Sequence, residues 1–147
     1  MATTNAVIIP LKFILITLQL LLLIGILATK DEYIFVGLPR YTKIGDEAFT
    51  LAQKELLWLT WLTIILLIFE LLTLSSGISV MFEKLNVFQV LFHFVGVNHL
   101  TLMILDRYSY TQMRSIAFFY AVIPFMMEAT ASVYAGSKIR IINQRLE

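Results

Sequence analysis

The sequence predicts an all-α fold, an integral membrane four-helix bundle with short connections. Of its 147 residues, 59% are hydrophobic and only 14% are charged, and the mean hydropathy is +0.85. A soluble domain of this length needs a far more polar surface. The apolar residues also gather into four stretches, each about as long as the ~20 helical residues that cross a bilayer core. Because lipid leaves no backbone group unpaired, such stretches form helices.

The whole chain, 1–147, is interpreted as a single membrane domain with four spans. The predicted spans are 7–29, 56–81, 85–105 and 115–136, and one sizeable loop, 30–55, separates the first two. In the first span, Pro10 and Lys12 lie in the opening turns, where a missing N–H is tolerated and a lysine can extend to the interface. The loop is too small for a core of its own, so we expect a short segment at the membrane surface.

Composition excludes several classes of function. A net charge of +1 with no basic block predicts no nucleic-acid partner. The absence of cysteine removes disulfides, thiolate metal sites and cysteine nucleophiles. The chain contains no Glu-x-x-His pair and no histidine pair at helical zinc spacing, so no metal or other cofactor is expected. No acid–histidine arrangement accompanies the serines, and we therefore expect no catalytic residues, no enzyme and no small-molecule substrate.

A layer of polar residues is predicted near the middle of the membrane. Its members are Glu70, His93, Asn98, His99 and Glu128. Counted from the turn at 83–84 with a rise of about 1.5 Å per residue, Glu70 falls at a depth between His93 and the Asn98–His99 pair. An ionised carboxylate at that depth is costly, so each glutamate must be neutral, paired or turned into the protein interior.

Small and polar residues at helical spacing predict the packing faces of the second and fourth spans. The residues assigned to helix packing are Thr73, Gly77, Ala121, Pro124, Ala131 and Ala135. Both glutamates lie on these faces, and small residues let helix backbones approach closely in lipid. Pro124 also frees the carbonyl of Tyr120, one turn earlier, and thereby predicts a kink.

Two interpretations of the polar layer stay open. Interhelical hydrogen bonds would fix the packing register of the bundle, whereas a proton or ion carrier would use the same glutamates and histidines as a relay. With only four spans and no pore-lining repeat, the structural interpretation is favoured. The basic residues Lys138, Arg140 and Arg145 lie together just past the last span, which favours both termini in the cytoplasm.

Several segments resemble the transmembrane protein 107 family. They are FELLTLSSGISVMF at 69–82, His93, DRY at 106–108, IPFMME at 123–128, PLKF at 10–13 and Leu38-Pro39. The resemblance covers about 10–138 in collinear order, and its most specific part is 70–82. Members are four-span proteins of the ciliary transition zone with no catalytic residues. Glu70, His93 and Glu128 match the family pattern but carry no assigned chemistry.

The resemblance implies a non-enzymatic, structural role with both termini in the cytoplasm. Such a protein belongs to the Meckel syndrome module, helps to assemble or localise its other membrane proteins, and maintains the gate that controls ciliary membrane composition. Its partners would be the lipid bilayer and other membrane proteins of a multi-subunit assembly. Two alternatives remain from the residues alone: a small accessory subunit of a large complex, such as a respiratory complex of the mitochondrial inner membrane, and the proton or ion carrier.

Overall fold

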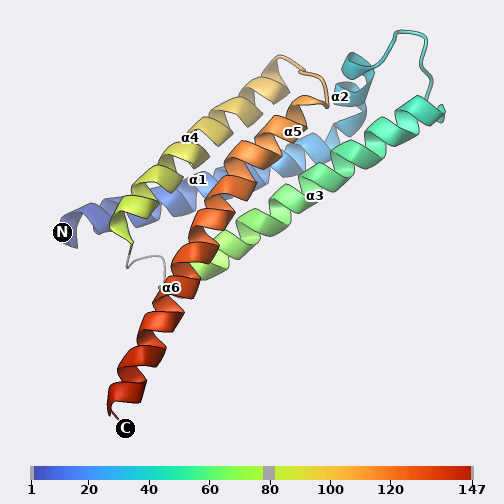
Figure 1. Ribbon diagram of the computed structural model, residues 1–147. Helices are drawn as coiled ribbons and strands as arrows, with labels where there is room; N and C mark the ends of the chain where they lie inside the picture. The colour runs from blue at the N-terminus through green and yellow to red at the C-terminus, as the bar shows by residue number, and fades with distance from the viewer. Residues whose placement is uncertain (1, 78–81, 147) are drawn as a thin grey trace.

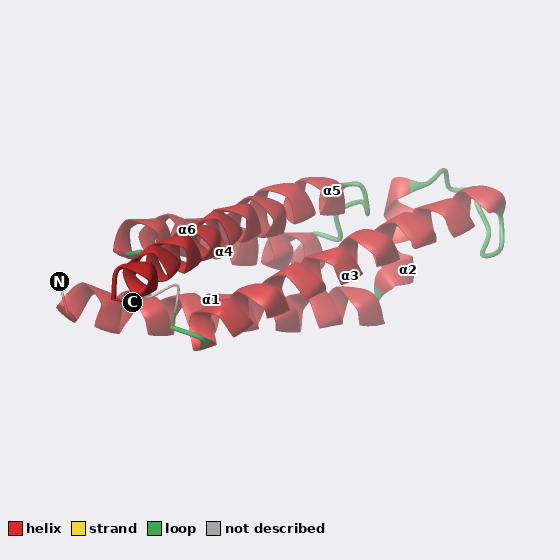
Figure 2. Ribbon diagram, turned by 60° about the horizontal axis from the view of Figure 1, so that its bottom comes forward, coloured by secondary structure: helices red, strands yellow, loops and turns green. Residues whose placement is uncertain are grey.

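The computed structural model describes the backbone of residues 2–77 and 82–146, and the side chains of 6–77 and 82–138. Its elements, in order, are α1 (Ala2–Ala28), α2 (Lys30–Gly37), α3 (Glu47–Ser75), α4 (Glu83–Leu105), α5 (Gln112–Ala117), the π-helical segment η2 (Phe118–Val122) and α6 (Ile123–Leu146). Over these described ranges the chain forms helices and turns without strands (Figures 1 and 2).

Four helical stretches of the described chain are long and apolar enough to cross a membrane. They are Ala6–Ala28, Glu47–Ser75, Glu83–Leu105 and Gln112–Lys138. The predicted fold class, an all-α membrane bundle, is therefore confirmed. Of the predicted second span, 56–81, residues 78–81 lie outside the described part.

The segment 30–55, expected to be a surface loop, is largely helical. It contains α2, and α3 already begins at Glu47. With 29 residues, α3 is roughly 43 Å long, well over the ~30 Å hydrocarbon core, so one end projects past the lipid. Helix α2 packs against α3, and the rings of Phe35 and Phe49 lie 5.2 Å apart there.

The four long helices form a ring in the order α1, α3, α6, α4. Helix α1 packs most extensively against α4 and also against α3, while α5, η2 and α6 contact both α3 and α4. Both ribbon views agree with this arrangement (Figures 1 and 2). Helices α1 and α6 therefore face each other across the ring, as do α3 and α4, although α3 and α4 are consecutive long helices in the chain.

Each long helix buries one stripe of residues that repeats every three or four positions. In α4 the buried stripe is Asn86, Gln89, His93, Gly96, Leu100 and Met103. This spacing is that of the core positions of an antiparallel four-helix bundle. The first half of the α4 stripe is polar and the second half is apolar, so one part of the bundle interior is polar and the other is a hydrophobic core.

The outward-facing surface is apolar, the reverse of a soluble bundle. Large hydrophobic side chains on different helices are exposed, among them Ile65 at 60%, Phe88 at 58% and Val133 at 73%. Lipid tails are as apolar as these side chains, so their exposure suits a membrane and would not suit water.

A short π-helical segment interrupts the last long helix directly before Pro124. The Ile123 N–H donates to the Phe118 carbonyl, five residues earlier. Proline has no N–H to offer the carbonyl of Tyr120, and its ring crowds that turn, so a widened turn is a direct response to it. Beyond the bundle, α6 continues as a single projecting helix (Figure 1).

Candidate functional site

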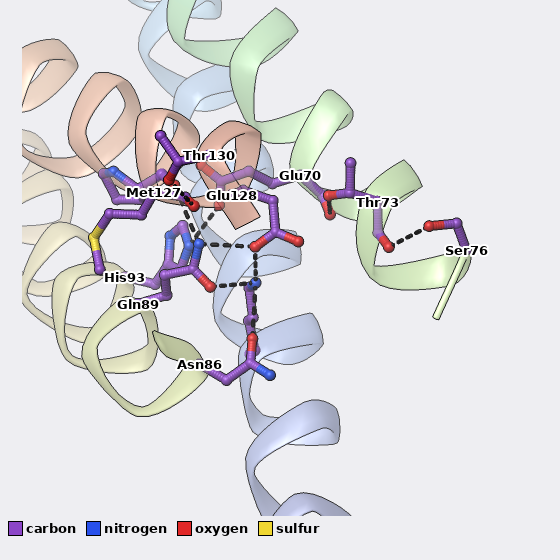
Figure 3. Close-up of polar contacts among 11 residues, drawn as sticks. Glu70, Thr73, Ser76, Asn86, Gln89, His93, Met127, Glu128 and Thr130 are labelled. Carbon is purple, nitrogen blue, oxygen red and sulfur yellow. Dashed lines mark hydrogen bonds and ion pairs between the residues drawn. The ribbon is translucent and has the colours of Figure 1, made fainter. Parts of the chain in front are cut away.

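One cluster of buried polar side chains joins α1, α4 and α6. Lys12 Nζ donates hydrogen bonds to Gln89 Oε1 at 2.6 Å, to Glu128 Oε2 at 3.0 Å and to Asn86 Oδ1 at 3.4 Å. Gln89 Nε2 donates to the same Glu128 oxygen at 2.9 Å and to the Pro124 carbonyl at 3.1 Å. Asn86, Gln89 and Glu128 point toward a common centre (Figure 3). The amide of Gln89 thus fills its two donor positions and its acceptor position.

A second cluster joins α1, α3 and α4 through the imidazole of His93. Its Nδ1 lies 2.7 Å from Gln19 Oε1, and its Nε2 lies 2.8 Å from Glu70 Oε2. The side chains of His93 and Glu70 are both 0% exposed. Both ring nitrogens therefore have a partner, and the ring orientation is fixed from two sides.

The hydrogen-bond partners of His93 determine how many protons this cluster holds. Gln19 Oε1 can only accept, so Nδ1 carries a hydrogen. The bond between Nε2 and Glu70 Oε2 contains one further proton, which gives either an imidazolium beside a carboxylate or a neutral imidazole beside a carboxylic acid. Both arrangements have zero net charge. In the first cluster the ammonium of Lys12 and the carboxylate of Glu128 also cancel. The two clusters together therefore bring no net charge into the membrane interior.

The two acid–base pairs connect helices that lie opposite each other in the ring. Lys12 and Glu128 join α1 to α6, and His93 and Glu70 join α4 to α3. The amides of Gln89 and Gln19 join neighbouring helices instead. Each long helix is therefore bonded through the centre of the bundle, where hydrocarbon packing alone is not directional.

Lys12 lies elsewhere than the sequence indicated. A lysine in the first turns of a span was expected to extend to the interface, but its side chain is 0% exposed. Glu128 and the two amides of α4 hold it in the interior. A lysine in the first span and a glutamate in the fourth were a signal for the Lys12–Glu128 pair. Only the order of the helices in the ring, however, shows that these two residues face each other.

Asn98 and His99 do not join either cluster. Asn98 is exposed on the outside of α4, and its Nδ2 donates to the Phe94 carbonyl of its own helix at 2.7 Å. His99 is half-buried, with its ring 5.7 Å from the ring of Tyr120. Five residues of helix turn Asn98 by about 140° from His93, which places it off the buried face.

The residues assigned to helix packing lie in different surroundings. Ala121, Pro124, Ala131 and Ala135 are buried. Thr73 is half-buried, and its hydroxyl donates to the carbonyl of Glu70 at 2.9 Å. Gly77 is exposed in the turn after α3, with φ of +77° and no atom within 4 Å of a Cβ placed there. Its requirement for glycine comes from that left-handed backbone and not from a helix contact.

Three helical segments approach one another closely at Gly96, which sequence reasoning did not single out. A Cβ at this position would lie 2.1 Å from Gln19 Nε2 and 2.9 Å from Tyr120 Cβ. Glycine thus lets α1 and η2 both press against α4 beside His93. Counting in steps of three and four from His93 reaches Asn86, Gln89 and Gly96, and this pattern was the available signal.

At the projecting end of α3, ion pairs connect the helices at the surface. The Arg114 guanidinium donates two hydrogen bonds to the Glu55 carboxylate, from Nε to Oε1 and from Nη2 to Oε2 at 2.8 Å. Arg107 Nε lies 3.3 Å from Glu32 Oε2, and both of these side chains are exposed. The paired fork of Arg114 fixes the start of α5 against α3.

The chemistry available to this interior is that of fixed hydrogen bonds. Among the described side chains, 6–77 and 82–138, no group of three or more histidine, aspartate or glutamate residues converges as a metal site would. The groove formed by Ile9, Pro10, Phe13, Ile14, Leu74 and Ser75 has a mainly apolar lining that contains no member of the two clusters.

The fold and its interior define a multi-pass integral membrane protein with four spans and a buried, mutually bonded polar centre. A family model described as a transmembrane protein, TMEM107, matches residues 8–132. The chain belongs to the TMEM107 family, as the resemblance in its sequence indicated. No curated protein and no solved structure matches it.

Proposed function

We propose that this protein is a non-enzymatic structural component of the ciliary transition zone. It would help to assemble or localise the membrane proteins of that module and so maintain the ciliary gate. Membership of the TMEM107 family supports the location. The main support for a structural role is that the buried acidic and basic groups bond to one another. Lys12–Glu128 and His93–Glu70 each join two helices that lie opposite each other in the ring.

A scaffold needs a rigid body with a constant outer surface, and the interior supplies rigidity. Lys12, Glu70, Gln89 and His93 are 0–1% exposed, as is Glu128. Hydrogen bonds between helices join these side chains, so sliding or rotating one helix breaks charged bonds in the membrane interior. A carrier would instead need these groups to reach water on each side in turn.

The proposed partners are the lipid bilayer and other membrane proteins of the same assembly. Lipid-facing side chains on the long helices offer an apolar surface to both. With both termini in the cytoplasm, the projecting end of α3 with α2 lies on the opposite side of the membrane. The C-terminal part of α6, which carries the basic residues after 137, then extends on the cytoplasmic side.

The test is the position of a fluorescently tagged copy in a ciliated cell, imaged against basal-body and mitochondrial markers. A focused signal at the ciliary base is expected, and removing the chain should disperse neighbouring membrane proteins from that site. A Lys54→Met variant, changed on the exposed surface, serves as the control and should localise normally. A mitochondrial signal would overturn the proposal and indicate an accessory subunit of a respiratory complex.

A further inference from the structure

The outer face of α4 carries a second stripe at three- and four-residue spacing. Its members, all exposed, are Phe88, Leu91, Val95, Asn98, Leu102 and Leu105. The stripe lies on the side of the helix opposite the buried stripe that begins at Asn86. This is the seam pattern of a coiled coil, with one asparagine among apolar residues, a feature that selects register and oligomeric state.

Asn98 is the residue that distinguishes this stripe from an ordinary lipid-facing surface. It lies seven positions before the end of α4, about 10 Å along the helix. One of its amide N–H groups is bonded to the Phe94 carbonyl. Among the described residues, its carbonyl oxygen and second N–H make no further hydrogen bond, and hydrocarbon offers none. A polar group in this position favours association with another helix.

We propose that the outer face of α4 binds the same face of a second copy of this chain. Copies inserted with the same orientation are related by a two-fold axis along the membrane normal, so their α4 helices run parallel. Each residue of the stripe then meets its own counterpart. An amide is self-complementary, because the free N–H of one Asn98 can donate to the free carbonyl oxygen of the other.

The surface beside the stripe has room for side chains of the second copy. A groove of about 400 Å³ lies between α4 and the π-helical segment, and it is lined by Phe88, Leu91, Phe92, Val95, Phe119 and Tyr120. Its lining is apolar, and three of its α4 residues belong to the stripe. Knobs from a facing helix would fill this groove, as the side chains of one coiled-coil helix fill the holes of the other.

The absence of native cysteine allows a direct test. Leu102→Cys places a thiol on the stripe one turn from Asn98, and Ile65→Cys places one on the outer face of α3, where Ile65 is 60% exposed. Each purified variant is reconstituted in lipid vesicles, oxidised and separated on a denaturing gel. We expect a disulfide-linked dimer from Leu102→Cys and far less from Ile65→Cys, since a disulfide needs closely facing thiols.

Adding Asn98→Val to the Leu102→Cys variant should weaken dimerisation by about tenfold. Adding Asn98→Gln instead should leave most of the dimerisation in place, because glutamine keeps the amide that makes the contact. Helical content by circular dichroism shows whether each variant remains folded. Equal cross-linking at the two cysteines would overturn the proposal. So would a dimer at Leu102→Cys that is indifferent to valine at position 98, because the asparagine would then have no part in the contact.

Discussion

Replacing Lys12 by methionine removes the ammonium that three buried acceptors share. The methionine has similar length, so the main change is electrical. Glu128, whose side chain is 1% exposed, loses this ammonium and keeps its hydrogen bond from the Gln89 amide. Removing one partner of a buried ion pair costs about 3–5 kcal/mol. We expect Lys12→Met to lower the free energy of unfolding by that amount.

The assay is reversible unfolding in mixed detergent micelles, followed by circular dichroism as the denaturing detergent increases. Lys54→Met is the matched control, because that lysine is exposed on α3, and it should change stability by less than about 0.5 kcal/mol. A loss of only about 0.2–1 kcal/mol for Lys12→Met, the value of a solvated pair, would show that Lys12 and Glu128 do not form a buried ion pair. The ammonium would then reach water, as the sequence alone suggested.

A double-mutant cycle separates the pair from its surroundings. Adding Glu128→Gln to Lys12→Met removes the buried carboxylate that has lost its ammonium, and leaves an amide that can still bond to Gln89. The double variant should therefore be more stable than Lys12→Met alone, with a coupling energy of at least about 2 kcal/mol. Additive effects would show that the two groups do not interact.

Three further substitutions give distinct expected results. Glu70→Gln retains a neutral hydrogen-bonding group beside the imidazole and should change unfolding free energy by about 1 kcal/mol or less, with cilia formed normally; loss of function with unchanged stability would favour the carrier. Gly96→Ala places a Cβ 2.9 Å from Tyr120 Cβ and should cost about 1–3 kcal/mol in the same assay; a neutral result would mean that the helices are not in contact there. Arg114→Ala removes the partner of Glu55 at the surface and should lower stability only slightly, an effect that shrinks with added salt; an effect independent of salt would contradict the ion-pair account.

Sequence patterns predicted the number of membrane helices well, because twenty-residue apolar stretches have few alternatives in lipid. The placement of Glu70 and Glu128 on inward faces also follows from helical periodicity, since each repeats with small residues at three- and four-residue spacing. His93 could be placed near them by depth along the returning helix. The structure brings Glu70 and His93 into direct contact.

The ring order could not be predicted from the sequence. Short connections suggest that consecutive spans are neighbours, yet α3 and α4 lie on opposite sides of the bundle. This order is set by side-chain packing, such as the close approach at Gly96, and not by any local pattern. The burial of Lys12 depends on it, because a lysine near a helix end either extends to the interface or pairs inward according to which helix faces it.

The helical periodicity of α4 indicates on which face of the helix Asn98 lies, whereas its depth in the membrane does not. At the depth of the polar layer it was grouped with the buried residues, although the helical rotation from His93 turns it toward lipid. The amides of Asn86 and Gln89 lie on the face of His93 and complete the interior. Depth and rotation together, applied to every polar residue of α4, would have separated the buried amides from the exposed one.

Proton flux into vesicles tests most directly the claim that the buried charges form a fixed framework. Purified protein is reconstituted with a pH-sensitive dye inside, and a potassium gradient with valinomycin imposes a membrane potential. Flux through wild-type vesicles is expected to equal that of protein-free vesicles and of the Glu70→Gln variant. Wild-type flux well above the lipid background, abolished by Glu70→Gln, would contradict a fixed framework and show that the interior conducts.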